Sequence, residues 1–212
     1  MKTLLEGQAA LVTGASRGVG KGIAVEVDRM FAEALAAFPR LDILVNNAGV
    51  QTWKALLDLE ESEWDRVIDT NLKGCFLCTQ RAAARMKEEG SGRIINIGSG
   101  CNKVAIPHLV DYTASKGGIE QFTKVAAVEL GKFGITVNCV APGSVETERT
   151  KLEAGDYAGT WASVTPLGRV GQPVDIGRVV VFLASNLADY VTGQTIYVDG
   201  GLYSRPYWPY EV

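Results

Sequence analysis

The sequence predicts a single α/β domain built on a parallel β-sheet. Residues 8–13 form a short apolar strand segment that leads at once into a glycine-rich turn and then into helical residues. Residues 93–97 form a second, buried strand segment that ends in a polar loop, where open α/β sheets bind their ligands. A chain of 212 residues, 47% of them hydrophobic, can bury one core, so residues 1–212 are expected to form one domain.

The other elements follow along the chain. Apolar segments at residues 41–45, 134–140 and 194–198 predict strands, and helical spacing of apolar residues predicts helices over 62–87, 111–130 and 173–184. The stretch 148–170 has mixed polarity and several glycines, and we expect it to be a mobile lid over the substrate.

The tail 202–212 is too rich in aromatic residues and proline for a helix. We expect it to dock on the substrate pocket of its own or a neighbouring subunit.

Ser99, Tyr112 and Lys116 are the main catalytic candidates. Tyr112 and Lys116 lie one helical turn apart and so share a helix face. A lysine cation within about 4–6 Å lowers the pKa of a tyrosine from its usual value of about 10, so that the phenol can serve as general acid or base. Ser99 follows the strand at 93–97, at the carboxyl edge of the sheet. On spacing alone, a surface tyrosine–lysine pair beside an ordinary loop serine explains the pattern equally well.

The glycine turn at residues 14–20 predicts a dinucleotide site. It stands between a strand and a helix, which is the context that such a turn requires. Its glycines permit a tight turn and a close approach of the backbone to pyrophosphate, which then accepts hydrogen bonds at the helix N-terminus.

Together these motifs resemble the short-chain dehydrogenase/reductase family over nearly the whole chain. The segments TGASRGVG (13–20), NNAG (46–49), YTASK (112–116) and PGSVET (142–147) occur in the family's order, with Asn71 and Ser99 between them. Near the C-terminus, PLGR (166–169), VTGQ (191–194) and VDGG (198–201) resemble the bacterial carbonyl reductase and sugar dehydrogenase branch. The resemblance implies a Rossmann-like, doubly wound parallel sheet.

The resemblance also implies roles for individual residues. Tyr112 would be the catalytic acid/base, Ser99 would hold the substrate oxygen, and Lys116 would bind the nicotinamide ribose and lower the tyrosine pKa. Asn71 would anchor a water that extends the proton relay, and Thr147 would contact the carboxamide. The residues implied to bind cofactor are Gly14, Ser16, Arg17, Gly18, Val19, Gly20, Asn47, Ala48, Gly49, Tyr112, Lys116, Pro142, Gly143, Val145 and Thr147.

The chain departs from the family pattern after Glu26. Only 26 positions separate Gly20 from Asn46, whereas the family places two further strands with their helices there, roughly 40 more residues at the usual size of βαβ units. Residues 18–38 read as the start of one helix joined to the end of a later one. Either a mobile segment is missing from the sequence, or the chain has a true deletion. We expect a five-stranded sheet with the first strand at its edge, and a right-handed crossover would place the joined helix on the later helix's face.

The cofactor is predicted to be NADP or NAD. The acidic residue that would hydrogen-bond the NAD ribose belongs to the missing second strand, and Glu33, the acid nearest that spacing, reads as a solvated helix position. Arg17 in the glycine turn favours NADP, because a guanidinium can bind the 2′-phosphate.

Other functional classes are disfavoured. A net charge of −3 gives no basic surface for nucleic acid, and no apolar run reaches the roughly 20 residues that span a bilayer. Cys75 and Cys78 lie in the apolar part of a helix, where core packing is favoured over redox or metal chemistry, and His108 is expected in a loop without a catalytic role. We therefore expect a cytoplasmic protein without a metal site, forming a homotetramer as the family does.

The function predicted is interconversion of a ketone or aldehyde with an alcohol by hydride transfer to or from NAD(P), with Tyr112 moving the proton. The alternative is a non-catalytic Rossmann-like protein in which a true deletion impairs cofactor binding and which acts through its oligomer surfaces.

Overall fold

The fold is built on one parallel β-sheet. In the computed structural model, residues 4–14, 23–38, 40–153 and 155–204 are described. The described strands, β1 (Ala10–Val12), β2 (Ile43–Asn46), β3 (Gly92–Ile97), β4 (Ile135–Pro142) and β5 (Thr195–Val198), pair in parallel in the order β1-β2-β3-β4-β5. This confirms the predicted Rossmann-like sheet of five strands with the first strand at the edge.

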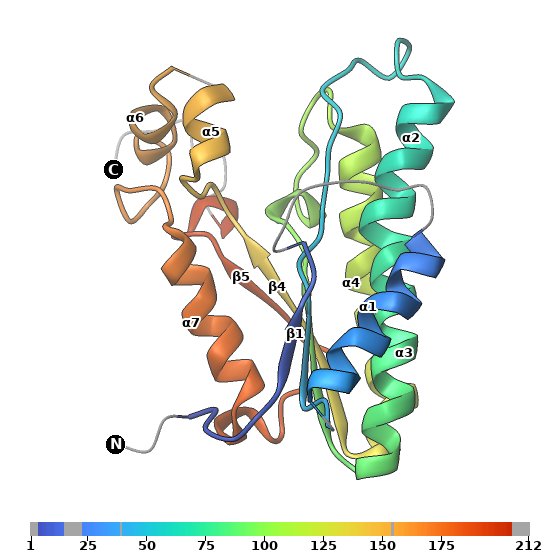
Figure 1. The fold of residues 1–212 in the computed structure, drawn as a ribbon. Coiled ribbons are helices and arrows are strands. Elements are labelled where there is room, and N and C mark those ends of the chain that lie inside the picture. Colours follow the sequence, from blue (N-terminus) through green and yellow to red (C-terminus); the bar gives the residue numbers. More distant parts are fainter. Residues whose placement is uncertain (1–3, 15–22, 39, 154, 205–212) are drawn as a thin grey trace.

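Helices cover both faces of the sheet. The α-helices are α1 (Ile23–Ala37), α2 (Glu61–Ile68), α3 (Gly74–Glu89), α4 (Val110–Leu130), α5 (Glu148–Glu153), α6 (Tyr157–Ala162) and α7 (Pro173–Ala184). Helices α1 to α4 lie on one side of the sheet and α7 on the other, while α5 and α6 stand beyond the carboxyl ends of the strands (Figure 1). The predicted lid at 148–170 thus contains two short helices above the edge where ligands bind in such sheets.

Each face of the sheet has its own core, because successive strand residues point to opposite sides. On one side, Leu44 and Ile94 pack with buried residues of α1, α3 and α4. On the other, Ile43 and Ile95 pack with Leu183 of α7. A strand buried on both faces reads as a continuous apolar run, which is why these strands could be located in the sequence.

Helix α1 packs on the same face of the sheet as α3 and α4. Val27 and Phe31 are buried in the same core as Met86 of α3, so α1 covers the face that α3 and α4 share. This is the face expected from a right-handed crossover. Beyond β1 the sheet has no further described strand, and Val12 remains 46% exposed. Glu33 lies on the exposed side of α1, in agreement with its interpretation as a solvated helix position.

The helix predicted over 62–87 is interrupted. Between α2 and α3 the backbone forms a π-helical turn, η1 (Asp69–Lys73). Such turns occur mostly as single insertions inside α-helices, often at functional sites. The turn carries Asn71, whose side chain is buried.

The start of α7 carries an ion pair that should make stability depend on pH. Asp175 accepts hydrogen bonds from Arg169 at 2.7 Å and from the backbone N–H of Gln172 at 2.8 Å, and these partners lower its pKa to about 2. A carboxyl group whose pKa falls below its ordinary value of 3.8 stabilises the fold above that pH and loses the contribution as the pH approaches 2.

Asp175→Asn should therefore lower the melting temperature at pH 7 and match the wild type near pH 2. Asp65→Asn, at an exposed carboxylate on α2, is the control. A difference at pH 7 that persists unchanged near pH 2 would contradict this assignment.

Candidate active site

Helix α4 presents Tyr112 and Lys116 on one face. The Lys116 Nζ lies 5.6 Å from the centroid of the Tyr112 ring and donates a hydrogen bond to the Ile97 carbonyl at the end of β3 at 2.7 Å. Lys116 is 3% exposed, whereas Tyr112 is half-buried. Burial lowers the pKa of Lys116, because desolvation disfavours its charged form, and the nearby thiols of Cys139, Cys75 and Cys101 act in the opposite direction. The predicted tyrosine–lysine pair is thus brought together at the carboxyl edge of the sheet.

Asn71 connects α4 to the loop after β2. Its Oδ1 accepts a hydrogen bond from the Val50 N–H at 2.8 Å, and its Nδ2 donates to the Val50 carbonyl and to Ser115 Oγ, both at 2.9 Å. Ser115 Oγ in turn donates to the Tyr112 carbonyl at 2.7 Å. Both amide hydrogens of Asn71 are therefore used within the protein. A relay water of the predicted kind would have to bind one of the oxygens of Asn71.

Ser115 is a positioning residue that sequence reasoning missed. It is fully buried between Tyr112 and Lys116 and joins the Asn71 side chain to the first turns of α4. Its place inside the YTASK motif is the signal that could have pointed to it.

Ser99 lies between β3 and a short 3-10 turn, η2 (Gly100–Asn102). Its Oγ accepts a hydrogen bond from the Cys101 N–H at 3.3 Å and so caps this turn. The hydroxyl hydrogen is free to turn toward a ligand, because the capping contact uses only a lone pair of the oxygen. The side chain is half-buried, as expected at the edge of a pocket.

The ends of β1 and β2 are locked together by Thr13, a second residue that the motif reading did not single out. Thr13 Oγ1 accepts hydrogen bonds from the backbone N–H groups of Asn47 and Ala48, both at 3.1 Å, and the Thr13 carbonyl accepts one from Asn47 Nδ2 at 3.1 Å. Gly14 has a φ of +71°, and a Cβ there would lie 2.6 Å from the Ala48 Cα. The first glycine of the predicted cofactor turn is thus required by its conformation and by its contact.

Gly49 leaves room in front of the Asn71 and Lys116 side chains. A Cβ at Gly49 would lie 3.6 Å from both Asn71 Oδ1 and Lys116 Nζ, and the residue is exposed. A ribose could therefore approach the Lys116 ammonium along the Gly49 backbone, so the described residues fit the nicotinamide half of a dinucleotide. Ser16, Arg17, Gly18, Val19 and Gly20 lie outside the described residues.

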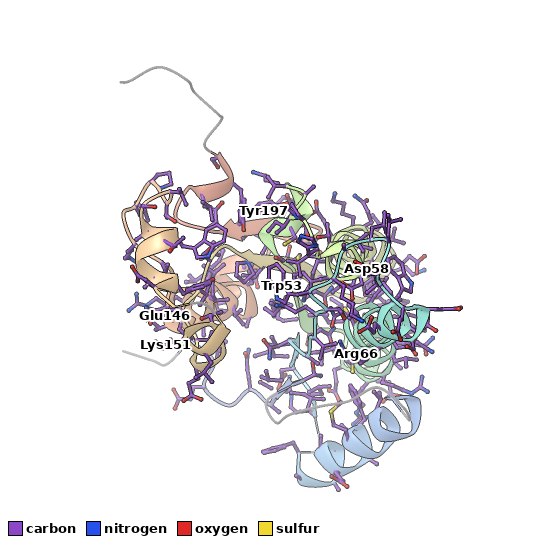
Figure 2. The ribbon with its side chains drawn as sticks, turned by 90° about the horizontal axis from the view of Figure 1, so that it is seen from above. Trp53, Asp58, Arg66, Glu146, Lys151 and Tyr197 are labelled. Atoms are coloured by element: carbon purple, nitrogen blue, oxygen red, sulfur yellow. The ribbon has the colours of Figure 1, made fainter. Side chains whose placement is uncertain are left out.

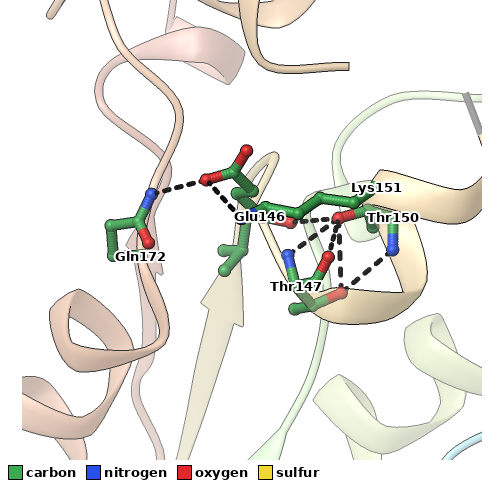
Figure 3. A network of polar contacts seen from close by, with 6 residues as sticks. Glu146, Thr147, Thr150, Lys151 and Gln172 are labelled. Atoms are coloured by element: carbon green, nitrogen blue, oxygen red, sulfur yellow. Dashed lines mark hydrogen bonds and ion pairs between the residues drawn. The ribbon is translucent and has the colours of Figure 1, made fainter. Parts of the chain in front are cut away.

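Residues 142–147 leave the end of β4 and lead into the lid. The Gly143 N–H donates to the Val198 carbonyl at 3.0 Å, and Val145 forms a parallel bridge with Gly171. The Thr147 hydroxyl accepts a hydrogen bond from the Thr150 N–H at 3.2 Å, and Thr150 Oγ1 accepts one from the Thr147 N–H at 2.8 Å (Figure 3). Thr147 therefore holds the start of α5, and a carboxamide contact would be an additional role.

Glu146, in the same segment 142–147, makes polar contacts with α5 and with the start of α7. Glu146 accepts a hydrogen bond from Gln172 at 3.3 Å and pairs with Lys151 at 3.6 Å (Figure 3). Viewed from above the sheet, Glu146 and Lys151 lie on one side and Asp58 and Arg66 on the other, with Trp53 between them (Figure 2).

The cysteines and the histidine behave as core and loop residues. All four thiols are free and buried, and burial raises the pKa of Cys75 to about 12 and that of Cys78 to about 11. His108 is exposed in the loop before α4.

Within the described part of the chain, no three His, Cys, Asp or Glu residues are grouped to hold a metal ion, and no helix has the length and hydrophobicity to cross a bilayer.

Comparison with known proteins identifies the family. A family model described as enoyl-(acyl carrier protein) reductase matches residues 14–203. The 3-oxoacyl-[acyl-carrier-protein] reductase FabG of Staphylococcus aureus is 39% identical over 241 aligned positions, which cover 92% of this chain and 98% of that protein. The chain belongs to the short-chain dehydrogenase/reductase family. It is accordingly an oxidoreductase of that family, as its motifs implied.

Two further proteins show how this short-chain dehydrogenase/reductase compares with its relatives. A Thauera aromatica protein, (2S)-[(R)-hydroxy(phenyl)methyl]succinyl-CoA dehydrogenase subunit BbsD, is 43% identical over 191 positions, covering 90% of this chain and 75% of that protein. The crystal structure of a gluconate 5-dehydrogenase from Burkholderia cenocepacia, in complex with NADP and tartrate, superposes with a TM-score of 0.87 at 31% identity, covering 95% of this chain and 97% of the other.

The alignment with the S. aureus reductase also shows that this chain is shorter within the aligned region. The 241 aligned positions contain 92% of 212, or about 195, residues of this chain, so 241 − 195, or about 46, positions of the relative have no counterpart. This number is close to the roughly 40 residues predicted to be missing after Glu26.

Proposed function

We propose that this short-chain dehydrogenase/reductase interconverts a ketone or aldehyde with an alcohol, using NAD(P) as the hydride carrier. The observation that carries the proposal is the grouping of Tyr112, Lys116 and Asn71 beside the exposed backbone of Gly49. A phenol held near a buried ammonium, next to a gap that a ribose fits, is an arrangement for moving a proton beside a bound nicotinamide.

Each residue then has a defined task. Nicotinamide supplies or accepts the hydride when it is bound. Tyr112 donates the proton to the carbonyl oxygen during reduction and removes it during oxidation. Lys116 favours the phenolate by its charge, and Ser99 donates a hydrogen bond to the substrate oxygen. Asn71 and Ser115 hold the first turns of α4 in register with the loop after β2.

For the cofactor we favour NADP. The strand that would carry the acid for the NAD ribose is absent beyond β1 among the described residues, so no carboxylate from such a strand would repel a 2′-phosphate. Arg17 in the glycine turn offers a guanidinium for that phosphate. The gluconate 5-dehydrogenase with the similar fold binds NADP in its crystal.

The relatives suggest two probe substrates. One is gluconate with NADP⁺, and the other is a short 3-oxoacyl thioester with NADPH, following the activities named for the similar proteins. Turnover of either would establish carbonyl–alcohol chemistry.

Binding of NADPH should raise the melting temperature of the protein, because a ligand that binds only the native state stabilises it. At a concentration 100 times Kd the stabilisation is about 2.7 kcal/mol. Thermal unfolding with and without NADPH or NADH measures this, and adenosine is the control for binding that needs no nicotinamide.

The second candidate is the non-catalytic protein. The free edge of β1 and the shortfall of about 46 positions (241 aligned against about 195 present) favour it. If neither NADPH nor NADH raises the melting temperature and neither probe substrate is turned over, this candidate is supported and the proposed enzyme is overturned. An intact mass of 22.7 kDa would show that the shortening is a true deletion.

We also propose that the protein is a homotetramer that buries the outer face of α3 and α4 against a second copy. Phe76, Phe122, Val125 and Phe133 line an apolar groove between these helices, and Val125 is 57% exposed. Contiguous exposed apolar side chains of this kind mark interaction surfaces.

Val125→Glu should convert the assembly into smaller species, because a charge in an apolar interface is left without a partner. Light scattering after gel filtration measures the mass. Leu152→Glu, at an exposed apolar residue on α5, is the control. An unchanged tetramer in Val125→Glu would place the interface elsewhere.

A further inference from the structure

Tyr203 is placed by the turn that follows β5. The Asp199 carboxylate accepts hydrogen bonds from the N–H of Gly201 at 2.9 Å and from the N–H of Tyr203 at 3.0 Å. The Leu202 N–H donates to the Asp199 carbonyl at 3.1 Å and completes a 3-10 turn, η5 (Leu202–Ser204). These hydrogen bonds fix the backbone from which the Tyr203 ring projects.

The ring rests on the backbone next to Ser99. A Cβ at Gly100 would overlap three atoms of the Tyr203 ring, so the ring occupies the space that any other residue at position 100 would need. Gly100 is buried, and it directly follows the serine predicted to hold the substrate oxygen. The absence of a side chain at position 100 therefore lets a phenol reach the edge of the site.

The Tyr203 side chain is half-buried. Burial raises the pKa of Tyr203, and the neighbouring Cys101, Tyr157, Asp199 and Tyr112 raise it further. These groups come from η2, α6, the turn after β5 and α4. The Tyr203 phenol stays protonated at neutral pH and does not compete with Tyr112 for the role of acid or base.

We propose that Tyr203 is a specificity-determining residue that limits the substrate pocket to compact ketones and alcohols. The inference rests on the proposed function and adds the size class of its substrate. A long or bulky acyl group bound to Ser99 and Tyr112 would have to displace a ring that packs directly on Gly100. Tyr203 is not among the atoms nearest to a Cβ at Gly14 or Gly49, beside which the cofactor is proposed to bind, so cofactor binding should not depend on the ring.

The experiment compares kcat/KM for a short methyl ketone and for its phenyl-substituted counterpart with NADPH. Tyr203→Ala should raise the ratio of kcat/KM for the bulky substrate to that for the small one by about tenfold or more, which is the least discrimination that one methylene group gives in an apolar pocket. Tyr203→Phe should keep the wild-type ratio, because the ring is retained. Stabilisation by NADPH should be the same in all three proteins. A ratio within about twofold of the wild type in Tyr203→Ala would overturn the proposal.

A second measurement tests the placement of the ring without turnover. Gly100→Ala should expel Tyr203 and speed hydrogen exchange at residues 202–204, while Gly177→Ala in α7, where a Cβ would meet nothing within 4 Å, should not. Unchanged exchange in Gly100→Ala would overturn the proposal. If no protein reduces any ketone or binds NADPH, the proposed function fails, and this exchange result still decides where Tyr203 lies.

Discussion

Tyr112→Phe should reduce turnover by on the order of 10²- to 10⁴-fold, the usual contribution of a positioned acid or base. The phenyl ring keeps the packing beneath Lys116, whose Nζ lies 5.6 Å from the ring centroid, and only the hydroxyl is lost. The melting temperature and its rise with NADPH should therefore remain close to those of the wild type.

The matched control is Tyr190→Phe, because Tyr190 is fully exposed and removal of its hydroxyl touches no part of the site. Initial rates with both probe substrates, at saturating NADPH or NADP⁺, measure the effect. Turnover in Tyr112→Phe that equals the wild type would refute the assignment of this phenol as the acid/base.

Gly14→Ala should abolish stabilisation by the cofactor and lower the stability of the fold. A non-glycine residue at a φ of +71° costs about 1–2 kcal/mol. The added Cβ would also lie 2.6 Å from the Ala48 Cα and 2.9 Å from its nitrogen, so the two strand ends that Thr13 locks together must separate.

Gly7→Ala carries the conformational cost alone and is the matched control. Gly7 has a φ of +78°, but a Cβ there would meet nothing within 4 Å. Urea unfolding should show the conformational cost in both variants and a further loss in Gly14→Ala alone, and NADPH should still stabilise Gly7→Ala. Equal losses in the two variants would mean that the contact between Gly14 and Ala48 does not hold the strand ends together.

Much of the fold could be predicted because its central strands, β2, β3 and β4, are largely buried on both faces. Residues 93–97 and 134–140 are rich in apolar and β-branched residues, and the structure contains β3 and β4 there. The helix predicted over 173–184 has those bounds as α7, because Pro173 favours the first helical turn and Ser185 ends the apolar pattern.

The remaining features depend on contacts between distant residues. The π-helical turn at Asn71 has no local signal, since it arises where the Asn71 side chain bonds Val50 and Ser115. Thr13 looks like the last residue of a strand, and its part in holding Asn47 and Ala48 is visible only once β1 and β2 are paired. Tyr203 could be assigned to an aromatic tail, but its contact with Gly100 joins residues far apart in the chain.

Transfer of deuterium tests the central claim most directly. NADPH deuterated at nicotinamide C4 on the transferred face is incubated with the wild-type protein and the short 3-oxoacyl thioester, and the alcohol product is analysed by mass spectrometry. NADPH deuterated on the opposite face is the paired sample. The proposed function predicts one deuterium at the new carbinol carbon from one of the two samples, and none when Tyr112→Phe replaces the wild type over the same time. Alcohol formed without deuterium from either sample, or no alcohol from this thioester and no oxidation of gluconate, would contradict it.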